Sequence, residues 1–273
     1  MSSGTTGRRR NIPGAGAAPN AGPDRVRTVL AACDAVDGFF AISTRDVEAA
    51  DPSWRPLARF LAVPEQGADP LADRLEQVAA GLGAPRRVAA SLLGQSLASR
   101  SLSVLLAAAA QGVLPALSPT SVLHARAWPG GPMPLWADPE RLDGVLLGAP
   151  DEPETAAALA RALAEDHVAP VVAAMRARAS VSERVLWGNA AGALGGAVRV
   201  LGSARPDLHD AALALARGVL AQPPFAGLGS FVADPDHPSG LGFARTTCCL
   251  YYQVPGGGKC GDCVLQPGRR AAR

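Results

Sequence analysis

The chain has few aromatic residues, almost no net charge and very little lysine. Aromatic residues make up 4% of its 273 residues, while hydrophobic residues make up 48%, so a core must be built mainly from Ala, Leu and Val. The formal charge of +2 does not indicate binding to nucleic acid. Lys259 is the only lysine and arginine supplies the other positive charges, a bias that fits a GC-rich coding sequence.

Targeting and membrane segments are not evident either. The triplet Arg8-Arg9-Arg10 is followed by Asn, Pro and Gly instead of an apolar stretch, so we expect no secretory signal. We therefore expect a cytoplasmic, reducing environment, which disfavours structural disulfides. The most apolar run, Ser101 to Leu117, contains Gln111 and Pro115 and is short for a spanning helix. It predicts a buried core helix in a protein that does not span the membrane.

Several catalytic motifs are missing from the sequence. The chain has no G-x-S-x-G elbow, no P-loop and no dinucleotide-binding glycine fingerprint, so nothing predicts an NAD or flavin site. His124 and His167 have no second ligand at a metal-binding spacing, so we interpret both as surface or core histidines. Electrons for any redox reaction would have to come from a separate carrier.

Cysteines, by contrast, are concentrated in one short segment. Four of the five lie within sixteen positions, at Cys248, Cys249, Cys260 and Cys263, where they could bind an iron–sulfur cluster or zinc, or form disulfides. Adjacent residues of an extended chain point to opposite faces, which makes one tetrahedral zinc awkward. Two irons are easier to reach if a local turn aims both sulfurs. The remaining Cys33 lies on an apolar helical stripe and is predicted to be a buried structural thiol.

The segment from Arg245 to Leu265, R-T-T-C-C-L-Y-Y-Q-V-P-G-G-G-K-C-G-D-C-V-L, resembles the C-terminal motif of the FhuF-type ferric-siderophore reductases. In that family C-C-x10-C-x2-C binds a [2Fe-2S] cluster, and the spacing here is the same. A weaker resemblance covers Ser182 to Asn189, which is similar to a tryptophan-glycine-asparagine helix of the family. The resemblance implies that the four clustered cysteines are the cluster ligands.

The resemblance also implies a function. The protein would reduce siderophore-bound ferric iron by one-electron transfer from the cluster and release ferrous iron in the cytoplasm, with the protein cytoplasmic or peripheral at the inner face of the membrane. Siderophores bind iron through hard oxygen donors, which hold ferrous iron much less well. An external donor such as a ferredoxin or flavoprotein would re-reduce the cluster. The alternatives are a non-enzymatic [2Fe-2S] electron-transfer or redox-sensing protein and a structural zinc-binding module.

A candidate substrate pocket is suggested by the helix expected over 182–201. Its interior contains the glycines Gly188, Gly192, Gly195 and Gly196. Each costs about 1 kcal/mol relative to alanine, so either another backbone packs closely or a pocket wall lies here. Trp187 offers a flat face to a chelate and Asn189 needs a hydrogen-bond partner if buried. We predict that both residues line the pocket together with Arg245, whose charge could ease cluster reduction unless it is simply exposed to solvent.

The pattern along the chain predicts an α+β fold that is predominantly α-helical. Helices are expected over 24–37, 69–83, 85–112, 151–167, 170–178, 182–202 and 206–221, and a loop leads from there through Gly240 to Phe243. A small antiparallel β-sheet is expected around residues 114–147. We expect four parts: a disordered tail over 1–23, a helix-rich reductase-like domain over 24–244, a cluster-binding segment over 245–266, and a loose tail over 267–273.

Overall fold

The structure, a computed structural model, describes residues 18–266. Most of the tail expected over residues 1–23, and all of the one expected over 267–273, lie outside the described residues. The described part is predominantly helical and carries three small antiparallel sheets. The expected α+β class is therefore confirmed.

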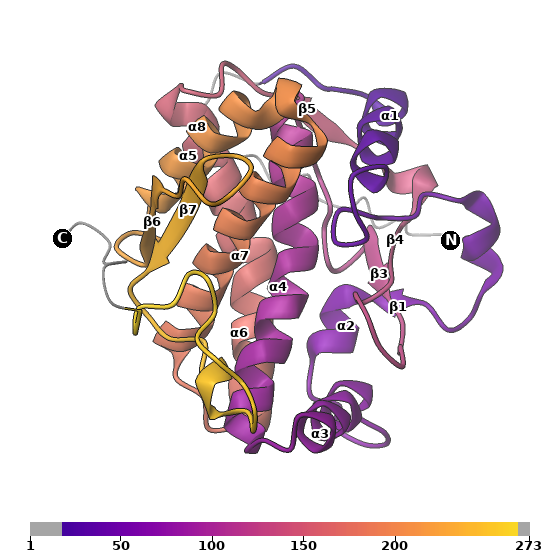
Figure 1. Ribbon diagram of the computed structural model, residues 1–273. Coiled ribbons are helices and arrows are strands. Elements are labelled where there is room, and N and C mark those ends of the chain that lie inside the picture. Colours follow the sequence, from indigo (N-terminus) through magenta and orange to yellow (C-terminus); the bar gives the residue numbers. More distant parts are fainter. Residues whose placement is uncertain (1–17, 267–273) are drawn as a thin grey trace, which may run out of the picture.

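Two long helices, α4 (Arg86–Ala110) and α7 (Glu183–Ala204), pack side by side at the centre (Figure 1). In the described part of the chain, α4 alone is long and apolar enough to span a membrane by length and composition, but 78% of its most apolar window is buried inside the protein. A helix that is apolar on most of its surface is normally buried, in a protein core or in a membrane, and α4 is buried inside the protein. This agrees with the core helix expected over 85–112.

The remaining helices surround this pair. They are α1 (Pro23–Asp34), α2 (Leu57–Leu61), α3 (Pro70–Leu82), α5 (Pro153–Arg161), α6 (Ala169–Arg178) and α8 (His209–Leu220). Short 3-10 turns lie at Asp46–Ala50, Pro139–Arg141, Pro206–Leu208 and Tyr251–Gln253. The start and end of α3 follow from its sequence: the Asp69 side chain accepts a hydrogen bond from Ala72 N at 3.0 Å, and Gly83 ends the helix at φ 57°.

The helices expected over 151–167 and 170–178 are joined in the structure. A π-helical segment, Ala162–Val168, connects α5 directly to α6. Pro170 lacks a backbone N–H and cannot continue a regular helical ladder, and such interruptions are commonly absorbed by a π turn. The start of α7 has no capping box, although Ser180 and Glu183 have the spacing of one. Ser182 is the N-cap and makes no side-chain cap hydrogen bond, while Glu183 pairs with Arg176 at 2.7 Å.

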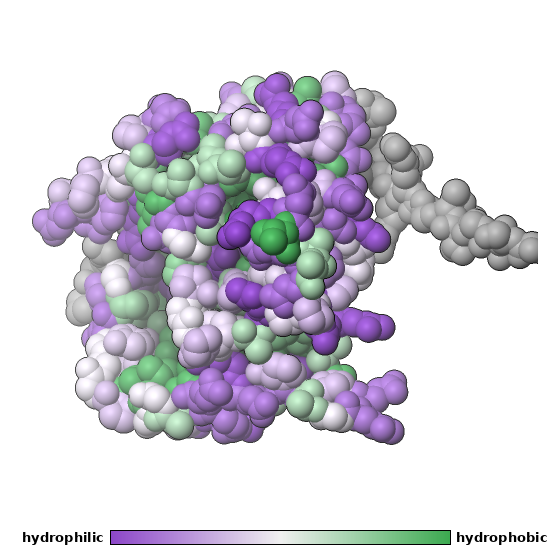
Figure 2. Space-filling model, turned by 90° about the vertical axis from the view of Figure 1, so that its right-hand side faces the viewer, coloured by the Kyte–Doolittle hydropathy of each residue, from purple (hydrophilic) through white to green (hydrophobic). Residues whose placement is uncertain are grey.

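The expected sheet around residues 114–147 is present as two small antiparallel sheets. One has the order β1 (Arg55–Pro56), β3 (Leu123–Ala125), β4 (Leu135–Ala137), and the other pairs β2 (Val113–Pro115) with β5 (Gly144–Leu146). These lie with α1, α2 and α3 on one side of the central pair (Figure 1). On this side the surface is mostly hydrophilic, with small scattered apolar areas (Figure 2).

A third sheet was not expected. β6 (Gly229–Ala233) and β7 (Leu241–Arg245) form an antiparallel hairpin where the sequence indicated a loop. The sequence of this hairpin lacks a clear strand pattern because it contains glycines at positions of close contact. A Cβ at Gly229 would lie 2.5 Å from Phe243 Cζ, and one at Gly242 would lie 3.0 Å from Asp234 Cβ. The hairpin matters for function because β7 leads directly into the cysteine segment.

Candidate iron–sulfur site

The cysteine segment is anchored through β7 to the glycine face of α7. A Cβ at Gly188 would collide with Thr247 Oγ1, one at Gly192 would lie 3.2 Å from Arg245, and one at Gly195 would lie 2.5 Å from Phe243 Cγ. These glycines are therefore present because another segment packs directly against the helix. Gly196 differs, since nothing lies within 4 Å of a Cβ there.

Residues 246–265, which we call the cluster loop, turn sharply at the adjacent cysteines. Leu250 has φ 68° and is the only non-glycine residue with positive φ in the described part of the chain. This turn lets Leu250 N donate to Cys248 Sγ at 3.3 Å. A matching contact forms at the other end of the loop, where Leu265 N donates to Cys263 Sγ at 3.4 Å. The loop thus supplies the local turn that the adjacent pair required, and backbone N–H groups face two of the sulfurs.

The sulfurs of Cys249 and Cys260 are 3.7 Å apart. Two sulfurs bound to one tetrahedral metal, with metal–sulfur bonds of about 2.3 Å, stand about 3.8 Å apart. This pair is therefore preformed for one metal ion. Within residues 18–266 no group of three or more metal-binding side chains stands at metal-binding separations.

Electrostatic interactions connect the thiols of the four cysteines. The hydrogen bond between the Cys249 and Cys260 sulfurs favours one thiolate, so it lowers the pKa of Cys249 to about 6 and raises the pKa of Cys260. Burial, with smaller contributions from the thiols of Cys249 and Cys263, raises the pKa of Cys248. The guanidinium of Arg245 acts in the lowering direction on the pKa of these three thiols. Cys263 acts on both Cys248 and Cys260, so the four sulfurs form one electrostatic group.

Buried hydrogen bonds tie this group to the two central helices. Arg245 of β7 is 1% exposed and donates to Asn189 Oδ1, and Asn189 is fully buried. Asn189 Nδ2 donates to Ser91 O at 2.7 Å and to Ser91 Oγ at 2.8 Å, and Ser91 Oγ donates to Cys249 O at 2.8 Å. The buried amide thus has the partners that it needs, and these bonds link β7, α7, α4 and the cluster loop.

A cavity of about 340 Å³ opens beside the preformed sulfur pair. We call it the cluster cavity. Its lining combines one side of α4 with the end of β7, the cluster loop and a loop that follows α1. The lining residues are Phe39, Leu92, Gln95, Ser96, Ser99, Arg245, Cys249, Tyr251, Cys260 and Asp262.

Comparison with known protein families supports the identity of this site. The family model described as FhuF 2Fe-2S C-terminal domain matches residues 245–265, and the model described as Ferric iron reductase FhuF-like transporter matches residues 130–232. Both matches support the FhuF-type family for this chain. A search of curated proteins found no match to this chain.

The cofactor of this FhuF-type protein is a [2Fe-2S] cluster, as its C-terminal domain indicates. The residues of the site fit that group. Four cysteines offer four thiolates, two of them stand at the separation that one iron requires, and Arg245 lies close enough to act on the pKa of three of them.

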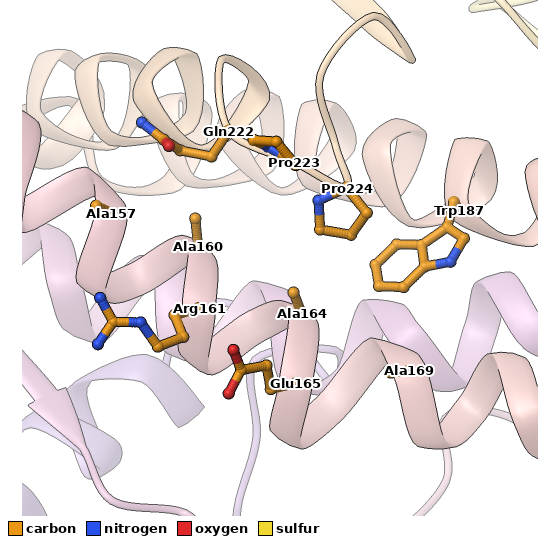
Figure 3. Close-up of a pocket in the computed structure, with 10 residues that line it drawn as sticks. All are labelled: Ala157, Ala160, Arg161, Ala164, Glu165, Ala169, Trp187, Gln222, Pro223 and Pro224. Carbon is orange, nitrogen blue, oxygen red and sulfur yellow. The ribbon is translucent and has the colours of Figure 1, made fainter. Parts of the chain in front are cut away.

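The structure separates the three residues expected to line the substrate pocket of the FhuF-type protein. Arg245 lines the cluster cavity, whereas Asn189 is enclosed between α4 and β7. Trp187 lines a different cavity of about 380 Å³, together with Arg161, Glu165 and other residues. There its ring lies near Pro224 and Ala164 (Figure 3) and meets Phe225 edge to face, with ring centroids 5.5 Å apart. No cysteine lines this second cavity, which we call the Trp187 cavity.

Sequence reasoning missed the part of the site that α4 contributes. Gln95, Ser96 and Ser99 face the cluster cavity from a helix whose buried positions are mostly Ala, Leu and Val. Their spacing of three and four residues places them on one side of a helix. That polar stripe inside an apolar helix was the available signal, and it points to an opening in the core beside α4.

Proposed function

We propose that this FhuF-type iron–sulfur reductase takes a ferric siderophore as its substrate, reduces the iron to the ferrous state by one-electron transfer and releases it in the cytoplasm. Cys248, Cys249, Cys260 and Cys263 would hold the cluster. The observation that carries this proposal is the cluster cavity, which gives a molecule from solution direct access to Cys249 and Cys260. A cluster used only to stabilise a fold needs no such opening.

The cluster, when bound, supplies one electron at a time and becomes more negative by one charge. The chain contributes the environment of that change. Arg245 places a buried positive charge beside the sulfurs, and backbone N–H groups of Leu250 and Leu265 donate to two of them. Both features favour the more negative, reduced state. They therefore raise the reduction potential relative to a site without donors or cations.

The reaction needs no covalent bond to be made or broken in the protein. The bound cluster would supply one electron to the ferric ion, and the hard oxygen donors would then hold the ferrous product much less well. An external carrier, a ferredoxin or flavoprotein, would return the electron, because the sequence carries no dinucleotide-binding glycine motif. We propose a cytoplasmic location, or a peripheral one at the inner face of the membrane.

A single-turnover experiment tests the proposal. The anaerobic protein is reduced with one equivalent of dithionite and mixed with ferric chelates, while reoxidation is followed in the visible spectrum and ferrous iron is trapped by a chromogenic chelator. We expect one ferrous ion per reoxidised cluster. A cluster that reacts with oxygen but with no ferric chelate would identify a sensor or electron carrier. Colourless protein with stoichiometric zinc would identify a structural zinc module.

A further inference from the structure

We infer that the ferric chelate docks on one stripe of α4, formed by Leu92, Gln95, Ser96 and Ser99, which lines the cluster cavity together with Cys249 and Cys260. The inference rests on the proposed function, because it assigns a place to the substrate of that reaction. It differs from the sequence-based expectation, which placed the chelate beside Trp187.

The residues of α4 that are not buried support this proposal. From Val88 to Ala109 every residue of this helix is buried except Leu92, Gln95, Ser96 and Ser99. All four of these line the cluster cavity. The central helix of the core is therefore open along one side only, and that opening leads to the cysteines.

The chemistry of the stripe suits a ligand rich in oxygen. Three of its four side chains are polar, in a helix whose other buried positions are mostly Ala, Leu and Val. Gln95 Oε1 accepts from Arg245 Nη1 at 3.4 Å, which leaves the amide NH2 group of Gln95 able to donate. Ser99 Oγ donates to Gln95 O at 2.8 Å, so its oxygen keeps lone pairs that can accept. The stripe thus offers at least one free donor and one free acceptor.

The other walls favour a bulky, partly flat molecule. Phe39 and Tyr251 contribute aromatic surface from two separate loops, and Tyr251 is 39% exposed, so it stands where a ligand would enter. The volume of about 340 Å³ is at the small end for ligand sites. It suits the iron-bearing part of a chelate, with the remainder outside in solvent.

Two of the four cysteines line the cluster cavity and the other two do not. Cys249 and Cys260 line the cluster cavity, whereas Cys248 and Cys263 do not. Cys249 and Cys260 are also the pair at 3.7 Å, the separation for one metal ion. A chelate on the α4 stripe would therefore lie next to two of the sulfurs that would hold the cluster, which keeps the path for the electron short.

The test fills the cavity without touching a cysteine. In the cluster-loaded protein, Ser96→Phe places a ring in the cluster cavity, and Ser203→Phe, at an exposed position of α7 outside that cavity, is the control that adds the same ring elsewhere. We expect Ser96→Phe to slow single-turnover reduction of a ferric trihydroxamate or tricatecholate at least tenfold, and Ser203→Phe to change it less than threefold. Both should keep the wild-type visible spectrum. If Ser96→Phe does not assemble the cluster, Ser99→Leu replaces it.

Binding without turnover gives a second readout. The gallium(III) complexes of the same two chelators cannot be reduced under these conditions, so calorimetry measures docking alone, and electron–nuclear double resonance detects gallium nuclei near the reduced cluster. We expect binding and a gallium coupling in the wild-type protein, with both lost or weakened at least tenfold in Ser96→Phe.

The outcomes separate the two proposals. If the wild-type protein reduces no ferric chelate, the proposed function fails. If the wild-type protein reduces a chelate and the cavity-filled variant does so at the same rate, with unchanged gallium binding, the docking site is elsewhere and the inference is overturned. Slowing in Trp187→Ala but not in Ser96→Phe would place the chelate in the Trp187 cavity.

Discussion

Arg245 donates a hydrogen bond from Nη2 to Oδ1 of Asn189, and both side chains are buried. Within the described chain, the charge of Arg245 faces this amide, the amide of Gln95 and the cysteine thiols. A buried cation without a carboxylate partner is costly unless an anion lies nearby. The cluster with its four thiolates is the anion that this site provides.

The first prediction concerns the charge of Arg245. Arg245→Gln should lower the reduction potential of the cluster by roughly 50–100 mV, because a unit charge at about 8 Å is worth about 2 kcal/mol at an effective dielectric constant near 20. Redox titration followed by electron paramagnetic resonance measures the shift. Arg161→Gln, in the Trp187 cavity, is the control and should leave the potential unchanged. An unchanged potential in Arg245→Gln would show that the guanidinium has only a structural role.

The second prediction uses two glycines of the same helix. Gly188→Ala should destabilise the protein by about 1–3 kcal/mol and lower cluster occupancy, because its methyl group collides with Thr247 next to Cys248. Gly196→Ala has free space around its Cβ and should stabilise the helix by about 0.5–1 kcal/mol. Thermal unfolding with iron analysis tests both. Equal effects at the two positions would contradict the close packing between α7 and the cluster loop.

Some features of this site could be predicted from the sequence and others could not. The cysteine spacing indicated one shared site because ligand spacing is a local property, and the family resemblance implied the [2Fe-2S] cluster. The glycines of α7 indicated close contact for the same reason, since each marks a missing side chain. The position of Trp187 could not be deduced, because its neighbours Phe225 and Pro224 come from a loop far along the chain.

The fold likewise has elements that could be predicted from the sequence and elements that could not. Helices with strong caps or long apolar runs, such as α3 and α4, were predicted close to their bounds. The hairpin β6–β7 was missed because Gly229 and Gly242 are fixed by tertiary contacts that no local pattern reveals. The polar stripe on α4 was visible in the sequence, but its meaning depends on the cluster loop, whose cysteines lie more than 140 residues further along.

The third prediction separates Cys33 from the other cysteines. Cys33 is fully buried, Gln111 Nε2 donates to its sulfur at 3.6 Å, and burial raises its pKa to about 12. Cys33→Ala should therefore keep the red-brown colour and about two irons and two sulfides per chain. Cys260→Ser and Cys263→Ser should abolish or strongly alter the visible spectrum. Loss of the cluster in Cys33→Ala would reveal a ligand role for this thiol.

The fourth prediction concerns His167, which is buried in the π-helical segment Ala162–Val168. Its Nδ1 has no hydrogen-bond partner among the described residues. Burial lowers the pKa of His167 from 6.5 to about 4. In the unfolded chain the imidazole takes up a proton near pH 6.5, whereas in the folded protein it does so only near pH 4. The part of the folding stability that depends on a neutral, buried His167 is therefore fully present above pH 6.5. It is lost as the pH falls from about 6.5 to 4.

The full loss amounts to about 3 kcal/mol, of which about 2 kcal/mol falls between pH 7 and pH 5, because each unit of pKa difference is worth about 1.4 kcal/mol. His167→Leu removes the titrating group at similar volume, so its free energy of unfolding should change less than that of the wild-type protein over this pH range. Urea unfolding followed by circular dichroism at pH 7 and pH 5 measures the difference, and acid effects on the cluster cancel because they act on both proteins. Parallel pH dependences in the two proteins would mean that His167 is hydrated or protonated inside the fold.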